Sequence, residues 1–370
     1  MYLDHASTSP LRPKARGAVL EWLDVVGDPS RVHAEGLVTR AAIEDARDQV
    51  AHLLGARNRE VVFTSGATEA IAAACWGTAS RGRRQVVPAV EHSAVRLSAE
   101  RHGEVTLVPV DAEGHVDPDR LLGAVSPDTA VLHLQWGNHE VGTLQPVAEV
   151  VAACRERGVL VHVDAAQAAG HVPFAFGDLG ADLVSVSAHK LGGPAGVGAL
   201  LVRRGVRLPP LLVGGDQERA RRAGLENVAA IMGFGAACAT LAEPGRLAAE
   251  AHRQRHLTNR VLAAAADLDG VRVYGDPRRR LPHLVCLGIE DIEPQAVLLG
   301  LDRAGIAAHS GSACSSESLE PSPVLEAMGV DAHHSLRISV GWSTTDTDID
   351  RLLESLPPVL AELRALATHA

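Results

Sequence analysis

The sequence predicts an α/β protein: a large domain built on a mostly parallel sheet flanked by helices, plus a smaller α+β domain. Short apolar, β-branched runs alternate with helical patterns up to about residue 250. These runs are continuous, which is typical of strands buried on both faces of a parallel sheet. Beyond that point the elements become sparser, so we expect a large domain over residues 14–247 and a small one that combines residues 1–13 with 248–370.

The elements follow from the spacing of apolar residues. Seven apolar runs predict strands, at residues 61–63, 86–90, 105–110, 130–134, 159–163, 183–186 and 197–202. Helical spacing predicts helices near residues 68–80 and 92–102, and an amphipathic helix through Ile43, Ala46, Val50, Leu53 and Leu54. The small domain is expected to hold helices at 246–267 and 294–304, strands at 283–289 and 335–340, and a terminal helix from 346.

Composition excludes several classes of protein. The chain has 370 residues and a net charge of −10, and aromatic residues make up only 3%, which argues against direct nucleic-acid binding. No apolar run approaches the roughly 18 residues of a membrane span, and the first residues do not resemble a secretory signal. Five cysteines without a C-x-x-C pair indicate reduced thiols. We expect a cytoplasmic enzyme with no membrane and no metal.

Polar residues follow the predicted strands, where ligands of open parallel sheets bind. The turn T-S-G-A-T-E, residues 64–69, precedes a helix and suits a phosphate. The same residues are also typical of an ordinary capped turn between a strand and a helix. Asp164 ends an apolar strand and needs a cationic or protonated partner. Lys190 follows another strand and is a candidate Schiff-base amine, or else a surface lysine.

Two histidines are weaker signals. His92 follows a strand, where a lone histidine is more often a helix cap or a surface residue. His139 beside Glu140 lacks the second histidine of a metal motif. A phosphate cup, an imidazole, a strand-end acid and a strand-end lysine at one sheet edge together fit one ligand. They are the parts that pyridoxal phosphate requires.

The chain resembles the cysteine desulfurases of the NifS/IscS type, within the class V aminotransferase superfamily. The likeness runs nearly end to end, through Y-L-D-H-A-S-T-S-P (2–10), D-P-S-R-V-H (28–33), T-S-G-A-T-E, E-H-S-A-V (91–95), G-N-H-E-V-G-T (137–143), H-V-D-A-A-Q (162–167), S-A-H-K-L-G-G-P (187–194), G-G-D-Q-E-R-A-R-R-A-G (214–224), S-G-S-A-C-S-S-E-S-L-E-P-S (310–322) and S-L-R-I-S-V-G (335–341). The resemblance implies the fold type I of pyridoxal phosphate enzymes, with a seven-stranded sheet.

The resemblance also implies roles for individual residues. Lys190 matches the lysine that binds pyridoxal 5′-phosphate covalently, Asp164 the acid on its ring nitrogen, and Gln167 the partner of its ring oxygen. His92 matches the imidazole stacked on the ring, which is also a proposed acid/base. The other matches are phosphate ligands and their helix start (Ala67, Thr68, Ser187, His189), substrate-carboxylate ligands (Asn138, Arg337) and the nucleophile (Cys314).

The implied reaction converts L-cysteine to L-alanine and leaves a persulfide on Cys314. That sulfur would pass to an acceptor protein, such as an iron–sulfur scaffold or a thiolation protein, and the enzyme would be a homodimer. Cys314 lies among serines and glycines, as an accessible thiol requires. The other four cysteines lie in apolar or helical runs and are expected to be buried: Cys75, Cys154, Cys238 and Cys286.

The chain departs from the family pattern at Leu225, where a threonine usually reaches the phosphate of the neighbouring subunit. We expect one phosphate hydrogen bond to be missing, with water or Arg222 as a substitute. Other class V activities stay open: a selenocysteine lyase, another C–S lyase or an aminotransferase. A scaffold that has lost catalysis is a further alternative. A nicotinamide dehydrogenase is disfavoured, because the glycines after Lys190 do not form G-x-G-x-x-G.

Overall fold

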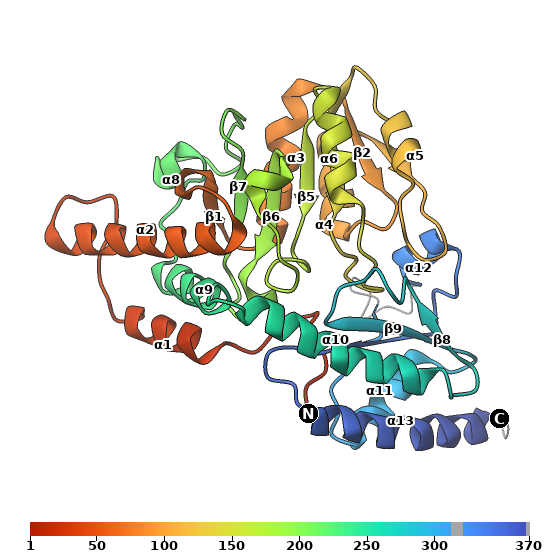
Figure 1. The fold of residues 1–370 in the computed structure, drawn as a ribbon. Coiled ribbons are helices and arrows are strands. Elements are labelled where there is room, and N and C mark those ends of the chain that lie inside the picture. Colours follow the sequence, from red (N-terminus) through yellow and green to blue (C-terminus); the bar gives the residue numbers. More distant parts are fainter. Residues whose placement is uncertain (312–320, 368–370) are drawn as a thin grey trace.

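The computed structural model describes residues 1–311 and 321–367 and confirms the predicted α/β class (Figure 1). Seven strands form one sheet in the order β1-β7-β6-β5-β4-β2-β3. They are β1 (Val61–Thr64), β2 (Arg84–Pro88), β3 (Glu104–Val108), β4 (Thr129–Gln135), β5 (Val161–Asp164), β6 (Leu183–Ser187) and β7 (Gly198–Val202). All pairs are parallel except those of β7, which runs antiparallel to both β1 and β6.

Burial explains why these runs form strands. Every residue of β1, β4, β5, β6 and β7 is buried, as continuous apolar runs predict. The edge strand β3 is the exception, since only Val108 in it is buried. Helices α2 (Ala34–Leu54), α6 (Val147–Glu156) and α9 (Val228–Leu241) cover one face, and α3 (Ala67–Thr78) and α4 (Ser93–His102) cover the other.

The smaller antiparallel sheet has the order β10-β9-β8 and a separate apolar core. Its elements are β8 (Val271–Tyr274), β9 (Leu284–Ile289) and β10 (Ser335–Ser339), packed with α10 (Arg246–Ala265), α11 (Pro294–Arg303) and α13 (Asp346–Ala367). The amino-terminal segment joins this part of the molecule: Asp4 bridges to Ser339, Leu3 lies in the same core, and the N-terminus lies beside α13 (Figure 1). The division into two domains and its boundaries stay a prediction.

The sequence did not predict β8 or α9. Strand β8 is short and only partly buried, so it lacks an apolar run. Helix α9 is apolar on all sides because it packs between other helices, and such a helix has no amphipathic pattern. The shorter helices are α1 (Pro13–Trp22), α5 (Pro118–Gly123), α7 (Phe176–Leu179), α8 (Gln217–Ala220) and α12 (Pro323–Met328). Within the described ranges no single helix could span a membrane by length and composition, and one bent pair, α9 with α10, meets those criteria jointly.

Candidate active site

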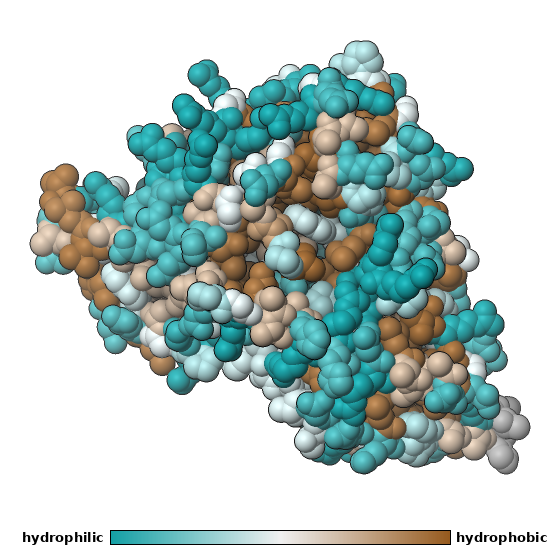
Figure 2. Space-filling model, viewed as in Figure 1, coloured by the Kyte–Doolittle hydropathy of each residue, from teal (hydrophilic) through white to brown (hydrophobic). Residues whose placement is uncertain are grey.

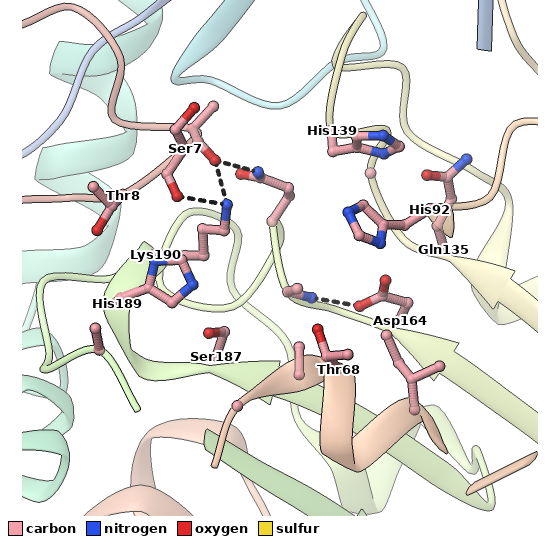
Figure 3. Close-up of a pocket in the computed structure, with 18 of the residues that line it drawn as sticks. Ser7, Thr8, Thr68, His92, Gln135, His139, Asp164, Ser187, His189 and Lys190 are labelled. Atoms are coloured by element: carbon pink, nitrogen blue, oxygen red, sulfur yellow. Dashed lines mark hydrogen bonds between the residues drawn. The ribbon is translucent and has the colours of Figure 1, made fainter. Parts of the chain in front are cut away.

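A cavity of about 550 Å³ opens at the carboxyl ends of the central strands (Figure 3). The last residues of β4, β5 and β6, namely Gln135, Asp164 and Ser187, all line it. The cavity brings together all eight residues predicted to hold a cofactor: Ala67, Thr68, His92, Asp164, Gln167, Ser187, His189 and Lys190. Residues far apart in sequence therefore meet at one sheet edge.

The start of α3 forms one wall of this cavity. Gly66 precedes the helix with φ +154° and ψ −177°, a backbone conformation that is essentially restricted to glycine. The first amides of a helix have no partner within it and carry the positive end of its dipole. With the Thr68 hydroxyl beside them, these groups suit a phosphate.

Asp164 is the buried acid of the site. Its Oδ1 accepts hydrogen bonds from the Ala166 amide at 3.0 Å and the Ser185 hydroxyl at 3.3 Å. Burial raises the pKa of this carboxyl, while the Ala166 amide and nearby His139 and Lys190 lower it. Among the described residues Oδ2 has no recorded partner, so it can bond to a ligand in the cavity.

Lys190 lies in the 3₁₀ turn η3 (Ala188–Lys190) that follows β6. Its Nζ donates to the carbonyl oxygens of Ala6 at 2.5 Å and Ser7 at 2.9 Å, as Figure 3 shows. Burial lowers the pKa of the Lys190 amine to about 8, and the Arg337 guanidinium adds to this shift. A neutral amine is the nucleophilic form, so this environment favours attack on a carbonyl carbon.

His92 is both a helix cap and a cavity residue. Its Nδ1 accepts the Ala94 amide proton at 3.0 Å, so in the neutral ring Nε2 carries the proton. Its ring centroid lies 4.8 Å from that of His139, in an edge-to-face arrangement. Burial, with the charges of His139 and Lys190, lowers the pKa of His92 to about 3. The cap that the sequence offered as an alternative therefore coexists with a place in the site.

Arg337 and Asn138 differ in position. Arg337, on β10, lines the cavity and is held by the His139 carbonyl, the Asp4 carboxylate and the Ser7 hydroxyl at 2.7–2.9 Å. Its buried Nε has no partner among the described residues. Asn138 does not line the cavity.

The Asn138 amide supports the neighbouring loop. Its Oδ1 accepts the Glu140 and Val141 amides at 2.8 Å, and its Nδ2 donates to the Val90 carbonyl at 3.1 Å. The structure therefore shows Asn138 as a loop support. Its predicted contact with the substrate carboxylate stays a prediction.

Gln167 is held by two partners. Its Nε2 donates to the Ala6 carbonyl at 2.7 Å and its Oε1 lies 3.1 Å from Nε2 of His283. Arg222, considered above as a substitute for the missing threonine, instead pairs with Glu69 in the first turn of α3 at 2.8 Å. Leu225 is 65% exposed.

Sequence reasoning missed several cavity residues. Ala6, Ser7 and Thr8 reach the site from the amino terminus, and His139 and His309 also line the cavity. The motif around residues 2–10 was a signal for the first group, but no local pattern assigned it a role. The contact between Ser7 and Lys190 could not be predicted from the sequence, because the two residues are far apart along the chain.

Four cysteines lie within the described residues and all four are buried, as predicted. Burial raises the pKa of Cys75 to about 12 and that of Cys154 to about 11. It also raises the pKa values of Cys238 and Cys286. None of these thiols is suited to act as a nucleophile. Cys314 lies outside the described residues.

One group of possible metal ligands occurs in the part of the chain that the structure describes. Glu113, His115 and Asp276 bring one ligand atom each within 4.8 Å of one another. None of the three lines the cavity.

The fold and the cavity define an α/β protein with a desolvated lysine and a buried acid at the edge of a mostly parallel sheet. The chain belongs to the class V aminotransferase family, since the model of that family, Aminotransferase class-V, matches residues 1–352.

Individual relatives and solved structures that resemble the chain carry more specific descriptions than the family model. A protein of Cereibacter sphaeroides named cysteine desulfurase is 42% identical over 380 residues, covering 99% of this chain and 97% of its own length. A solved NifS-like protein superimposes with a TM-score of 0.90 at 31% identity, covering 98% of this chain and 100% of that one. A structure described as SspA in complex with cysteine has a TM-score of 0.80 at 27% identity, covering 92% and 98%.

Proposed function

We propose that this chain is a cysteine desulfurase that uses pyridoxal 5′-phosphate to convert L-cysteine to L-alanine. One observation carries the proposal: the Lys190 amine, with its pKa lowered to about 8, and the buried Asp164 carboxylate line the same cavity of about 550 Å³. Full-length similarity to proteins named cysteine desulfurase supports the choice of reaction.

The residues present fit the cofactor. The start of α3, with Thr68, Ser187 and His189, would hold the phosphate. Oδ2 of Asp164, which has no hydrogen-bond partner among the described residues, would accept a hydrogen bond from the protonated ring nitrogen. The amide of Gln167 would face the ring oxygen. The imidazole of His92 offers a face for the ring, which matters in a chain with few aromatic residues.

When bound, pyridoxal phosphate withdraws electrons from the substrate Cα and so makes its proton acidic. The chain's own residues then divide the work. Lys190 Nζ, neutral in a desolvated site, takes and returns that proton. The hydrogen-bond donors to Asp164 favour its ionised form against the effect of burial, and the carboxylate would hold a proton on the ring nitrogen. The Arg337 guanidinium, with Nε unpaired, binds the substrate carboxylate, for which its planar fork is suited.

The sulfur acceptor within the enzyme is Cys314, on the basis of its motif at residues 310–322. Its thiolate attacks the substrate sulfur, the C–S bond breaks, and the carbon side leaves as L-alanine after protonation. One thiol and one cysteine thus yield one persulfide and one alanine, with no external oxidant. The burial of all four described cysteines supports this assignment, since none of them can reach a substrate.

We further propose that the enzyme works as a homodimer that passes its persulfide to an acceptor protein. Exposed apolar side chains gather at the connection of α1 and α2, where Figure 2 shows a brown patch at the tip of the molecule. They are Leu23, Val25, Val26, Val32, Leu37 and Val38. Such a patch suits an interface between copies. An iron–sulfur scaffold or a thiolation protein as acceptor, and a cytoplasmic location, stay predictions.

Two variants test the reaction. Lys190→Ala should abolish turnover of L-cysteine. Cys314→Ala should still bind the cofactor and stay yellow, yet form no protein persulfide and release no alanine from cysteine. Cys154→Ala, which removes a buried thiol, is the matched control and should keep wild-type turnover. If Cys314→Ala desulfurates cysteine at the wild-type rate, the nucleophile is assigned incorrectly. Formation of a keto acid in place of alanine would instead indicate an aminotransferase.

A further inference from the structure

A stripe of buried polar side chains crosses four strands of the otherwise apolar large sheet. It runs from Gln85 on β2 through His133 on β4 and His162 on β5 to Ser185 on β6, and it ends at Asp164. The strand register places these residues on one face: His133 pairs with His162, and Ser185 pairs with Asp164. This is the face that α3 covers. All four residues before Asp164 are fully buried.

Hydrogen bonds connect the stripe without a break. The Gln85 amide lies 2.8 Å from Nε2 of His133, whose Nδ1 lies 2.9 Å from Nδ1 of His162. Nε2 of His162 lies 3.1 Å from the Ser185 hydroxyl oxygen, and that hydroxyl donates to Oδ1 of Asp164 at 3.3 Å. The four contacts join the sheet interior to the acid of the cavity.

We propose that His162 and His133 are positioning residues that act through Ser185 to keep Asp164 ionised and aimed at the cofactor ring nitrogen. This inference rests on the proposed cofactor. Neither histidine lines the cavity, so neither can touch the substrate.

Only one arrangement of protons along these hydrogen bonds lets Ser185 donate to an ionised Asp164. If the Ser185 proton points to the carboxylate, the Ser185 oxygen must accept from Nε2–H of His162. Nδ1 of His162 is then an acceptor, so Nδ1–H of His133 must donate to it. Nε2 of His133 is then an acceptor as well. Its possible donors are the Cys75 thiol, whose Sγ lies 3.8 Å away, and the Gln85 amide.

The Gln85 amide can supply that donor. As placed, its oxygen faces His133, and its buried nitrogen has no partner among the described residues. Turning the amide by half a rotation exchanges the two ends and lets the nitrogen donate to Nε2. With Asp164 ionised, the reverse direction would turn the Ser185 proton toward His162 and leave the Ser185 oxygen facing a carboxylate oxygen with no proton between them.

Burial keeps both imidazoles neutral, as this chain of donors requires. It lowers the pKa of His133 to about 3 and places that of His162 well below its usual value. Buried polar groups weaken a core unless each is paired, and an apolar stripe would fill this space at less cost. The buried polar stripe is therefore best explained as support for the charged Asp164 carboxylate at its end.

A ligand pair tests the proposal on the full-length protein. We would measure the affinity of wild type and His162→Phe for pyridoxal phosphate and for its 1-deaza analogue, which has carbon in place of the ring nitrogen. His162→Phe should weaken binding of pyridoxal phosphate about tenfold, the effect of losing support for one charged hydrogen bond. It should change binding of the analogue little, because that ligand makes no bond to Asp164. Leu183→Ala, at the β6 position beside His162, is the matched packing control.

The outcomes separate the possibilities. An equal loss for both ligands, or no loss for either, would overturn the positioning role. Ser185→Ala should reproduce the selective loss if His162→Phe does not fold. Nitrogen NMR of histidine-labelled wild type should show the Nε2–H tautomer for His162, and the Nδ1–H tautomer would also overturn the proposal. A wild-type protein that binds no pyridoxal phosphate would contradict the proposed function itself.

Discussion

Lys190 and Ala6 are joined by a hydrogen bond of 2.5 Å from the lysine Nζ to the alanine carbonyl oxygen. The two residues belong to different parts of the molecule, because Lys190 follows a strand of the large sheet and the segment of Ala6 bridges to the small one. The same carbonyl also accepts the Gln167 amide at 2.7 Å. The amino-terminal segment therefore lines the cavity, and its carbonyl groups hold the Lys190 amine in place.

The buried amine of Lys190 should make stability depend on pH. Its folded pKa of about 8 lies below the ordinary value of 10.5, so between these values the unfolded chain binds more protons and stability rises with pH. Below pH 8 the folded state bears the full cost of the buried charge, about 3 kcal/mol for the cofactor-free protein. Urea unfolding of wild type and Lys190→Met should show it: the wild-type free energy of unfolding, minus that of the variant, should increase from pH 7.5 to 10. A flat difference would contradict the lowered pKa.

The phosphate site should depend on the Thr68 hydroxyl. Thr68→Val keeps the shape of the side chain but removes the donor at the start of α3. We expect affinity for pyridoxal phosphate to fall roughly tenfold, since hydrogen bonds to charged groups contribute about 1.5–3 kcal/mol. Thr68→Ser should restore it. Pyridoxal without phosphate is the control ligand, and an equal loss for that ligand would place the effect elsewhere in the site.

Arg337 should select for a substrate carboxylate. Arg337→Lys keeps the charge but loses the planar fork, so we expect KM for L-cysteine to rise at least about tenfold with a smaller change in kcat. Cysteamine, which lacks the carboxylate, is the matched substrate. The wild type should turn over cysteamine poorly, and Arg337→Lys should turn it over at the same rate as the wild type. A parallel loss with both substrates would indicate that Arg337 supports the fold near Asp4.

A buried ion pair should stabilise the edge of the large sheet. Arg47 on α2 contacts both carboxylate oxygens of Glu218 at 2.6 and 2.7 Å, and both side chains are almost fully buried. Arg47→Met leaves a buried carboxylate without its cation and should lower the free energy of unfolding by about 3–5 kcal/mol.

The double variant Arg47→Met/Glu218→Met should recover part of the stability lost in Arg47→Met. Lys14→Met, which breaks an exposed pair with Glu243, should have little effect in the same urea titration. A double variant no more stable than Arg47→Met would show that burial of Glu218 without its cation is not the cause.

Much of the fold could be predicted because continuous apolar runs record burial on both faces. All seven runs became strands of one sheet, with ends that shifted by a few residues. The antiparallel direction of β7 could not be read in this way, since an apolar run carries no direction. Helix α9 lacked a pattern because other helices surround it.

The site was predictable where a residue followed a strand. Asp164, Ser187 and Lys190 each come at or just after the end of one, and strand ends gather at one edge of the sheet. Contacts between distant segments were not predictable, such as Asp4 with Arg337. Nor did the sequence show that the Asn138 side chain would bond to backbone amides of its own loop, because that contact depends on the geometry of the loop.

By itself, the sequence determined the α/β class, the family resemblance and the residues that can carry charge, nucleophiles and phosphate ligands. These properties are local, since they depend on residue type and short spacing. Tertiary structure alone decided that the lysine is desolvated beneath Ala6 and Ser7, and that four polar residues on four strands form one stripe behind Asp164. Such properties depend on which segments meet in space, and burial and hydrogen bonding act only after they have met.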